Sequence, residues 1–374
     1  MSIPRIGIDC RLAGSQHVGI GRYVVELVSR LTQHSDINWV LFYSDQTQLA
    51  ELFPQFVPDY CQLLYTPVKH YTLLEQLAMN SAYTKAKLNL LHVPHFNVPM
   101  LYRGCLIITI HDLLWHQQKG QQVTTLPSWQ YWPKYFFYRM VTNHAVAHAK
   151  FIFVPSKTVK QTIAAYYPQV QSKVIVTHEG VSRSLQLASQ QLKKTPRKKQ
   201  LIYVGSLYPH KNISLVITAL KQLPDYSLVL VGSRSVFRDQ VQNQVTQLGL
   251  TNQVSFLSAI NDLELAKLYS QAFALIQPSF SEGFGLTGIE AMQFETPVLA
   301  SDITIFHEIY QQGAVYFNPL SVVDFCQQVK ALDHPELRKK IAAAQKKVIT
   351  QYSWDTLAKK TYQVYLDQLK QAHD

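Results

Sequence analysis

The chain of 374 residues contains little charge, few cysteines and no long apolar run, and each of these absences excludes a class of protein. Charged residues make up 16% of the chain, which argues against long disordered tails. No run of about 18 apolar residues is present, so we expect no transmembrane helix. The first residues contain no basic region followed by an apolar one, so we expect no signal peptide.

The cysteines are scattered and show no spacing typical of a metal site. The chain has four, Cys10, Cys61, Cys105 and Cys326, and no two of them form a C-x-x-C pair. Isolated buried thiols are typical of a reducing compartment, so we expect a cytoplasmic protein. His144 and His148 lie one turn apart on an expected helix, but the nearby sequence offers no third ligand for a metal. We therefore interpret these histidines as surface or interface residues and expect no bound metal.

Positive charge is in excess, with a net charge of +11 and an isoelectric point of about 9.3. Such an excess suits an anionic partner, which could be nucleic acid, a lipid headgroup or a phosphorylated ligand. The densest basic cluster, residues 193–199, lies in a polar, glutamine-rich stretch that starts near Ser184. A solvated linker is the simplest interpretation of this stretch, and contact with a membrane surface is the alternative. No nucleic-acid-binding signature accompanies it, so we expect no nucleic acid partner.

Residues 129–139 form an unusual aromatic segment with one lysine and one arginine. Packing in a core is the simpler account of so many rings. A belt of Trp and Tyr with Lys and Arg is also what an interfacial contact with a membrane would use. The sequence leaves both interpretations open.

Short apolar runs alternate with segments of helical periodicity along the whole chain. The first half predicts strands at residues 5–9, 39–43, 88–93, 106–110, 151–154 and 174–177, and helices at 21–31, 71–86 and 129–150. The second half predicts strands at 201–204, 228–231, 254–257, 274–277 and 298–300, and helices that begin near residues 213, 238, 262 and 288. Asn261 with Glu264 three residues later predicts a capping box for the helix near residue 262.

This alternation predicts an α/β protein with parallel sheets that are covered on both faces. We expect two Rossmann-like domains that face each other across a cleft. The first would span residues 1–183 and bind the acceptor, and the second would span residues 200–353 and bind the donor. A basic linker at 184–199 would join them, and a helix at 354–374 would cap the second domain or cross back to the first.

The most informative segment of the chain is residues 278–292. It follows an apolar run at 273–276, contains a glycine-rich turn, and starts a helix close to Thr287. Such a turn directs backbone N–H groups beyond the end of the strand, where they can bind an anion. Glu282 lies in the turn and Glu290 in the first turn of the helix, where carboxylates can bind hydroxyls. The combination predicts a site for a phosphorylated sugar.

Two other interpretations of this segment are possible. Gly283, Gly285 and Gly288 also fit the pattern G-x-G-x-x-G of a dinucleotide site. That pattern belongs in the first strand–helix turn of its domain, whereas this one follows the expected fourth strand of its half. In a purely structural interpretation, Glu290 is an acid that the helix dipole favours near the helix start, and the glycines only form a tight connection between strand and helix.

Ligands of parallel α/β sheets bind beyond the carboxyl ends of the strands, which selects further residues. Lys211 precedes Asn212 at an expected helix start, where an ammonium group is unfavourable unless an anion is bound. We therefore expect Lys211 to bind a diphosphate. Ser206 could donate its hydroxyl to the same phosphates. Arg234 follows the next strand, but such arginines often pair with surface acids instead.

The first half offers fewer candidates at its strand ends. Gly19 and Gly21 leave room for the backbone to approach a ligand or the other domain. The third glycine of a dinucleotide fingerprint is absent there, because Val24 occupies its position. His111 directly follows an apolar strand, and we expect it to contact a sugar. The alternative is a buried histidine that bonds a neighbouring backbone group.

Together these motifs resemble the retaining glycosyltransferases of the GT-B class, family four, and most of all its mannosyltransferase-like members. The resemblance rests on residues 6–9, 19–23, 111–113, 204–212, 282–292 and 296–298. The arrangement Glu-x7-Glu with an internal Gly-Phe-Gly is specific in this context. The resemblance implies that the second domain holds a nucleotide-sugar donor and the first an acceptor.

Residue by residue, the resemblance implies that Glu290 binds the donor ribose and Glu282 the hydroxyls of the transferred sugar. Lys211 would bind the diphosphate, and His111 would contact the transferred sugar. The catalytic residues would thus be Glu282, His111 and Lys211. The other expected donor-binding residues are Gly19, Gly21, Ser206, Arg234, Gly283, Phe284, Gly285, Leu286 and Thr287.

The resemblance also implies transfer with retention of anomeric configuration, by attack on the same face and without metal or another cofactor. In agreement, the sequence contains no Asp-x-Asp pair that could chelate a metal. Two residues depart from the family pattern. Ser206 stands where many relatives have arginine, and Glu295 where they usually have glycine. If the backbone at Glu295 is left-handed, this residue costs about 1 kcal/mol.

We therefore expect a cytoplasmic glycosyltransferase that moves a hexose, mannose in the first place, from a nucleoside diphosphate to a glycan or lipid-linked acceptor. The basic surface favours a peripheral position on the inner face of a membrane. One alternative is a subunit that binds nucleotide sugars without catalysis. The other, which we favour less, is an NAD-dependent oxidoreductase.

Overall fold

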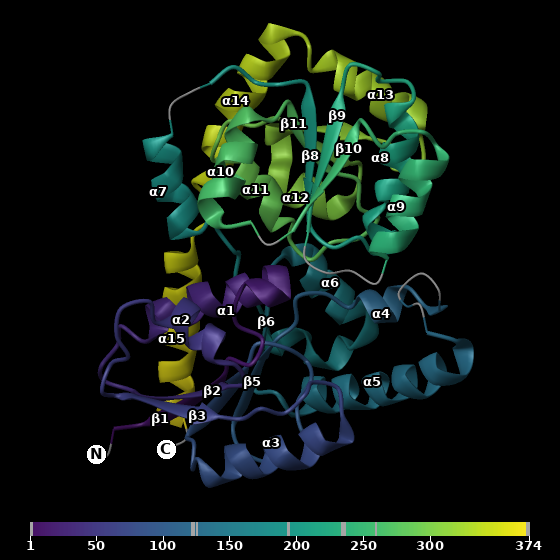
Figure 1. Cartoon of the computed structure of the whole chain (residues 1–374). Coiled ribbons are helices and arrows are strands. Elements are labelled where there is room, and N and C mark those ends of the chain that lie inside the picture. Colours follow the sequence, from purple (N-terminus) through teal and green to yellow (C-terminus); the bar gives the residue numbers. More distant parts are fainter. Residues whose placement is uncertain are drawn as a thin grey trace. The chain divides into compact units, whose positions relative to one another are not determined.

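The computed structural model describes residues 3–120, 124, 126–192, 195–232, 237–258 and 260–371, apart from the side chain of Val18. The chain forms two compact units (Figure 1). Unit 1 comprises Met1–Leu113, Pro127–Glu179 and Trp354–Asp374, and unit 2 comprises Leu114–Leu126 and Gly180–Ser353.

Unit 1 contains a seven-stranded parallel sheet with the order β3-β2-β1-β4-β5-β6-β7. Its strands are β1 (Arg5–Asp9), β2 (Asn38–Tyr43), β3 (Cys61–Tyr65), β4 (Leu90–Val93), β5 (Leu106–Thr109), β6 (Phe151–Val154) and β7 (Val174–Val176). The first six follow the doubly wound order of Rossmann-like domains. The strand order therefore reverses between β1 and β4, where such sheets bind ligands.

Helices connect these strands, as the parallel pairing requires. They are α1 (Val18–Leu31), α2 (Gln46–Leu52), α3 (Leu73–Lys85), α5 (Ser128–His148) and α6 (Lys157–Tyr166), with the 3-10 turns η1 (Ser15–His17) and η3 (Pro168–Lys173). The C-terminal helix α15 (Trp354–Gln371) also belongs to unit 1, although unit 2 precedes it in the chain (Figure 1). Tyr365 of α15 is fully buried, and its hydroxyl bonds Nδ1 of His92 in the central strand β4.

Unit 2 repeats the same scheme with six parallel strands in the order β10-β9-β8-β11-β12-β13. They are β8 (Gln200–Val204), β9 (Ser227–Val231), β10 (Val254–Leu257), β11 (Ala274–Gln277), β12 (Val298–Ser301) and β13 (Ala314–Phe317). The helices are α4 (Leu114–Gln117), α7 (Arg183–Gln191), α8 (Ile213–Leu220), α9 (Arg238–Gln247), α10 (Asp262–Gln271), α11 (Leu286–Met292), α12 (Thr304–Tyr310), α13 (Val322–Ala331) and α14 (Pro335–Ile349), with the 3-10 turns η4 (Pro209–Lys211) and η5 (Gln311–Gly313).

The central strands are buried on both faces, which explains why they appear in the sequence as continuous apolar runs. Every residue of β4, β5, β11 and β12 is buried. The two-domain α/β fold predicted from this pattern is confirmed. The capping box is also confirmed, because Asn261 and Glu264 bond each other's backbone N–H at the start of α10.

The sequence prediction missed two strands, β3 and β13, each of which is an edge strand. The middle residues of both strands are only partly buried or exposed. β13 (Ala314–Phe317) is wholly apolar and was missed despite its composition, whereas the pattern of β3 is weak. β3 contains Gln62 and ends at the exposed Tyr65, and its sequence does not stand out from a loop.

The stretch at 184–199 differs from the solvated linker that the sequence suggests. It begins inside α7, which is part of unit 2 and buries Leu185 and Ala188. Arg197 is partly buried, and its guanidinium donates to the carbonyls of Tyr269 and Phe294, among others. Burial and the nearby charge of Arg338 together lower the pKa of this guanidinium to about 10. The hydrogen bonds of Arg197 therefore hold this part of the stretch against unit 2. Lys193 and Lys194 lie outside the described residues.

Candidate functional site

The glycine-rich turn of unit 2 connects β11 to α11, and its shape depends on Tyr310. Gly285 caps α11 with a left-handed backbone, at φ +87°. The buried Tyr310 hydroxyl donates to the Gly285 carbonyl at 2.6 Å. A Cβ atom would lie 2.3 Å from the Tyr310 side chain at either Gly285 or Gly288. Both glycines are therefore required by packing, whatever they contribute to ligand binding.

Lys211 and Glu282, which the sequence selects independently, form an ion pair in unit 2. Lys211 Nζ lies 2.6 Å from Glu282 Oε1, and the two side chains are 17% and 15% exposed. Ser279 Oγ donates to the same carboxylate oxygen at 2.8 Å. Burial tends to raise the pKa of Glu282, but Lys211 and the hydrogen bonds outweigh it, so the pKa is lowered. Lys211 is thus a cation that keeps contact with water beside the glycine turn.

His210 adjoins this pair and was not selected from the sequence. Its side chain is buried, and its Nδ1 atom has no hydrogen-bond partner among the described residues. Burial and the charge of Lys211 together lower the pKa of His210 to about 4. His210 is therefore neutral near pH 7. Only the fold reveals this, because a histidine beside a lysine in the sequence would be expected at the surface.

Glu290 lies in the second turn of α11, one turn later than the sequence predicts, because the helix begins at Leu286, and it is buried. Its Oε2 atom accepts a hydrogen bond of 3.1 Å from the buried hydroxyl of Tyr269. Burial raises the pKa of Tyr310 well above its usual value, and the charges of Glu282 and Glu290 raise it further. Both predicted carboxylates therefore lie within electrostatic reach of the same tyrosine.

The remaining predicted residues of unit 2 have mostly structural contacts. Thr287 Oγ1 accepts a hydrogen bond from Gln277 at the end of β11. Phe284 is buried and packs edge-on against Tyr352, with ring centres 5.4 Å apart. The carbonyl of Ser206, which follows β8, accepts from the Tyr203 hydroxyl at 2.5 Å.

Gly283, Leu286 and Arg234 are the remaining predicted positions of unit 2, and Leu286 packs against its hydrophobic core. Gly283 is part of the turn and Leu286 begins α11. The first N–H groups of a helix have no partner within the helix, which applies here to Leu286 and Thr287, whereas the Gly288 N–H donates to the Gly285 carbonyl at 3.0 Å. Arg234 lies outside the described residues. Glu295 has φ +54°, so the left-handed backbone considered from the sequence is confirmed.

In unit 1, Gly19 and Gly21 both lie in the first turns of α1. A Cβ atom on Gly21 would lie 1.9 Å from the Gly14 carbonyl oxygen, so this glycine allows two backbone segments to approach each other. Gly19 is exposed, and a Cβ atom there would meet nothing within 4 Å. Only Gly19 is therefore free of an internal packing requirement.

His111 follows β5 and is mostly buried. Its Nε2 atom bonds the Pro94 carbonyl at 3.2 Å. This is the kind of backbone contact that the alternative interpretation of a buried histidine predicts. Its Nδ1 atom lies 3.7 Å from Glu179 Oε1, and its ring packs edge-on against Tyr23. The imidazole is therefore held in position from three sides within unit 1.

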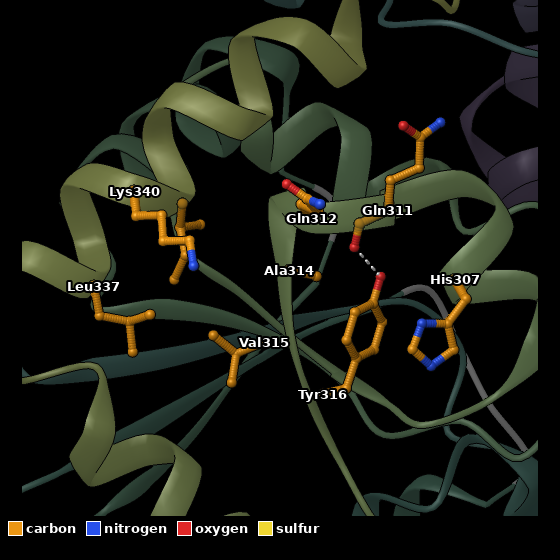
Figure 2. A pocket seen from close by; sticks show the side chains of 9 residues that line it. His307, Gln311, Gln312, Ala314, Val315, Tyr316, Leu337 and Lys340 are labelled. Carbon is orange, nitrogen blue, oxygen red and sulfur yellow. Dashed lines mark hydrogen bonds between the residues drawn. The ribbon is translucent and has the colours of Figure 1, made fainter.

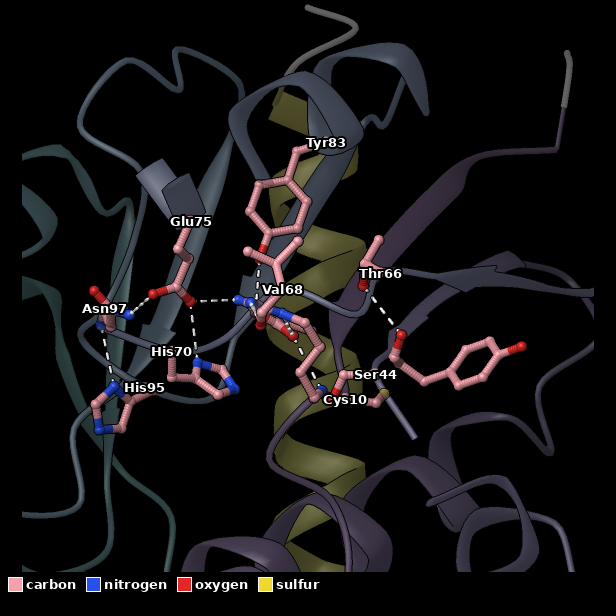
Figure 3. Close-up of polar contacts among 12 residues, drawn as sticks. Cys10, Ser44, Thr66, Val68, His70, Glu75, Tyr83, His95 and Asn97 are labelled. Carbon is pink, nitrogen blue, oxygen red and sulfur yellow. Dashed lines mark hydrogen bonds and ion pairs between the residues drawn. The ribbon is translucent and has the colours of Figure 1, made fainter. Parts of the chain in front are cut away.

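A buried polar network at the carboxyl end of β1 was also missed from the sequence. Arg11 bonds both carboxylate oxygens of Asp9, at 2.9 and 2.7 Å, and Glu75 Oε1 at 2.9 Å. Figure 3 shows Glu75 of α3 bonded in turn to His70 and Asn97. Burial tends to raise the pKa of Asp9, but Arg11 outweighs it and lowers the value to about 2.

An open cavity of about 530 Å³ also lies in unit 2, away from the predicted residues (Figure 2). It is lined by His307, Gln311, Gln312, Ala314, Val315, Tyr316, Leu337, Lys340 and Ile341. The rings of His307 and Tyr316 stack at 3.9 Å, and the Tyr316 hydroxyl donates to the Gln311 carbonyl. No residue predicted from the sequence contributes to this cavity.

Among the residues that the structure describes, no helix is long and apolar enough to cross a bilayer. The same residues contain no group of three His, Cys, Asp or Glu side chains placed to hold a metal ion. All four cysteines are free thiols.

Residues 186–348 match the family model described as glycosyl transferases group 1. The chain is 28% identical over 319 residues to the O-antigen chain mannosyltransferase RfbU of Salmonella typhimurium (strain LT2), covering 82% of this chain and 84% of the relative. It is 24% identical over 380 residues to the O-antigen chain mannosyltransferase B of Escherichia coli, covering 93% and 95%. The crystal structure of Anabaena HepE in complex with UDP and glucose matches 97% of this chain and 100% of its own, with a TM-score of 0.73 at 16% identity.

The similarity to the HepE structure shows the fold of the chain. The similarity in sequence to the two mannosyltransferases indicates its family. Both units have the parallel sheet and strand order of Rossmann-like domains, as expected for the GT-B class. The segment that matches the family model contains Lys211, Glu282 and Glu290. The chain therefore has the GT-B fold, its residues 186–348 match the glycosyl transferases group 1, and over most of its length it is similar to mannosyltransferases.

Proposed function

We propose that the protein is a retaining glycosyltransferase that transfers mannose from a nucleoside diphosphate to a glycan or lipid-linked acceptor. The observation that carries the proposal is the ion pair of Lys211 and Glu282 beside the glycine-rich turn. Two relatives named as O-antigen chain mannosyltransferases support mannose as the sugar and a growing glycan as the acceptor.

In this proposal the donor binds to unit 2. Lys211 and the N–H groups from Phe284 to Thr287 hold the diphosphate, with Ser206 and Arg234 as further donors. Lys211 now pairs with Glu282, so an incoming diphosphate would share the ammonium group and leave the carboxylate to accept hydroxyls of the sugar. Glu290 binds the ribose. The complex of HepE with UDP and glucose supports a nucleotide sugar as the donor.

The chemical step places negative charge on the departing diphosphate. A fixed cation and oriented N–H groups in a partly buried site stabilise such charge, and this is often the largest contribution to catalysis. Lys211 supplies the cation, so the step needs no metal ion. Attack of the acceptor on the same face of the sugar would retain the anomeric configuration. His111 and Gly19 of unit 1 would contact the transferred sugar and the acceptor.

We further propose that the enzyme is cytoplasmic and peripheral to a membrane, where lipid-linked acceptors are anchored. The net charge of +11 supports an anionic surface as a partner. A non-catalytic subunit would bind the donor equally well, so binding and turnover must be measured separately.

The test combines thermal shift with an assay of sugar transfer. GDP-mannose, UDP-glucose and the free nucleotides are compared, because a ligand that binds the folded state raises the melting temperature. We expect the largest shift with a mannose nucleotide and slow donor hydrolysis without acceptor. Glu290→Ala should weaken donor binding, and Glu282→Ala should mainly lower transfer. Wild-type transfer rates in both variants would overturn the assignment of roles.

A further inference from the structure

Helix α5 of unit 1 carries a row of large apolar side chains that face solvent. Trp129, Trp132 and Phe136 are 74%, 51% and 65% exposed, and Met140 continues the row. Spacings of three and four residues place all four on one face of the helix. Tyr131 in the same segment is buried. Core packing, the simpler interpretation of this aromatic segment, is therefore wrong for both of its tryptophans.

A second exposed apolar group lies at the start of α3 and consists of Leu73, Leu74 and Leu77. A chain of ring contacts links the two helices within unit 1. Tyr138 of α5 packs against Phe96, whose ring contacts His95, and His95 bonds the hydroxyl of Tyr71 just before α3. The two helices therefore flank the same loop, and Figure 1 shows both in unit 1. We call the seven exposed residues the α3–α5 face.

The positive charge of the protein is concentrated in the segment that contains this face. Residues 61–178 contain 11 Lys and Arg but only two acids, Glu75 and Asp112, a net charge of +9. The rest of the chain has 24 Lys and Arg against 22 acids. Ten of the basic residues belong to unit 1, namely Lys69, Lys85, Lys87, Arg103, Lys134, Arg139, Lys150, Lys157, Lys160 and Lys173, and Lys119 belongs to unit 2. Glu75 is buried in its ion pair with Arg11, which leaves Asp112 as the one acid that reaches solvent.

Exposed Trp, Phe and Leu within a basic segment are the combination expected of a protein that lies on an anionic bilayer. Tryptophan prefers the headgroup region, and the apolar side chains enter the acyl boundary. Each nearby Lys or Arg adds attraction to anionic lipids. Nucleic acid would use the charge but not the leucines, and an ordinary protein interface is depleted in lysine.

We propose that the α3–α5 face docks the protein onto an anionic lipid surface. The lipid surface is the membrane partner expected from the proposed function, and in this respect the docking rests on that proposal. The docking itself is tested by lipid binding, without any assay of sugar transfer. Failure of lipid binding would leave sugar transfer to a soluble acceptor intact, and failure of sugar transfer would leave lipid binding intact. The two proposals therefore stand or fall separately.

The first test is sedimentation of the full chain with vesicles. Vesicles of phosphatidylcholine with about one third phosphatidylglycerol are compared with pure phosphatidylcholine, at low and high salt. We expect binding to the anionic vesicles that weakens as salt screens the charges. Equal binding to both vesicles, or no binding to either, would overturn the proposal.

Variants then locate the docking surface. The triple change Trp129→Ser, Trp132→Ser and Phe136→Ser should weaken vesicle binding at least tenfold and leave the melting temperature nearly unchanged, because the three side chains are exposed. Leu320→Ser with Val323→Ser provides the matched control, since both are exposed apolar residues of unit 2. Equal binding by the triple variant and the control would overturn the proposal. So would a concentration-dependent dimer that the triple change abolishes, because the face would then join two copies of the chain.

Tryptophan fluorescence offers an independent measurement. Of the five tryptophans, Trp39 and Trp354 are buried and Trp115 of unit 2 is partly buried, whereas Trp129 and Trp132 would enter the lipid headgroups. We expect anionic vesicles to shift the emission to shorter wavelength, and brominated lipids to quench it. Trp129→Phe with Trp132→Phe should remove both changes while preserving sedimentation with vesicles. Unchanged quenching in that variant would place the lipid contact elsewhere.

Discussion

Unit 1 and unit 2 hold their charged side chains differently at the point where the strand order reverses. In unit 2, the single ammonium of Lys211 meets one carboxylate, and both retain contact with water. In unit 1, Arg11 is fully buried and is shared between Asp9, Glu75 and the Val68 carbonyl. The first arrangement can exchange its partner for an incoming anion. The second is already satisfied, so we expect it to support the fold and to bind no diphosphate.

The buried network of unit 1 should give the largest effect on stability. Arg11→Met leaves the carboxylates of Asp9 and Glu75 buried without their cation, so we expect the free energy of unfolding to fall by about 3–5 kcal/mol. Urea unfolding at neutral pH measures this loss. Lys339→Met is the control, because its pair with Glu336 is exposed and such pairs contribute about 0–1 kcal/mol. Equal midpoints for both variants would refute the contrast between the two units.

Lys211 should show the opposite behaviour, with a large effect on catalysis and a smaller one on stability. Lys211→Ala removes the cation that stabilises the leaving diphosphate, and loss of one such group typically lowers kcat by about 10²–10³. Steady-state assays of sugar transfer measure the change. Lys221→Ala, at an exposed position after α8, should leave kcat unaltered. If Lys211→Ala kept wild-type kcat but unfolded readily, its role would be structural, like that of Arg11.

Mild acid should destabilise both units, because each buries a neutral histidine. Burial lowers the pKa of His95 to about 3 in unit 1 and that of His210 to about 4 in unit 2. As the pH falls from about 6.5 to 4.5, the unfolded chain binds protons that the folded state does not, so stability decreases. Each group contributes up to about 1.4 kcal/mol per pH unit.

His95→Gln should therefore make the free energy of unfolding less dependent on pH in this window, by about 1 kcal/mol per pH unit. Urea unfolding at pH 7.0, 5.5 and 4.5 gives the slope. The pKa of Asp9, lowered to about 2, affects stability only in stronger acid, below its usual value of 3.8. A slope identical to that of the wild type would mean that His95 is protonated in the folded protein.

The smallest effect concerns Glu295, at φ +54° in unit 2 and outside its predicted site. Glu295→Gly removes the cost of a left-handed backbone and should stabilise the protein by about 1 kcal/mol. The loss of the exposed ion pair with Lys346 would offset part of this gain. Lys346→Ala alone measures that part. A destabilised Glu295→Gly variant with an unaffected Lys346→Ala variant would disprove the strain.

The part of the site that the sequence predicted consists of residues close to the glycine-rich turn and to η4. These residues could be predicted because each residue type at a strand end indicates a function by itself: glycine a tight turn, lysine an anion site, and glutamate a site for hydroxyls. Even so, Lys211 and Glu282 were predicted with separate roles, and their direct contact across 71 residues became visible only in the fold. The network of Arg11 and Glu75 was missed because 64 residues separate the two side chains.

The sequence by itself determined the two α/β domains, their alternating strands and helices, and the composition of the turn after β11, because hydrophobic periodicity and glycine act over short distances along the chain. Tertiary structure alone decided which charges are paired, which histidines are neutral, and which aromatic side chains of α5 remain exposed. These properties depend on burial and on neighbours from distant segments. The contribution of a charged or aromatic side chain to the free energy of folding depends on whether water or another side chain surrounds it, and only the fold determines this.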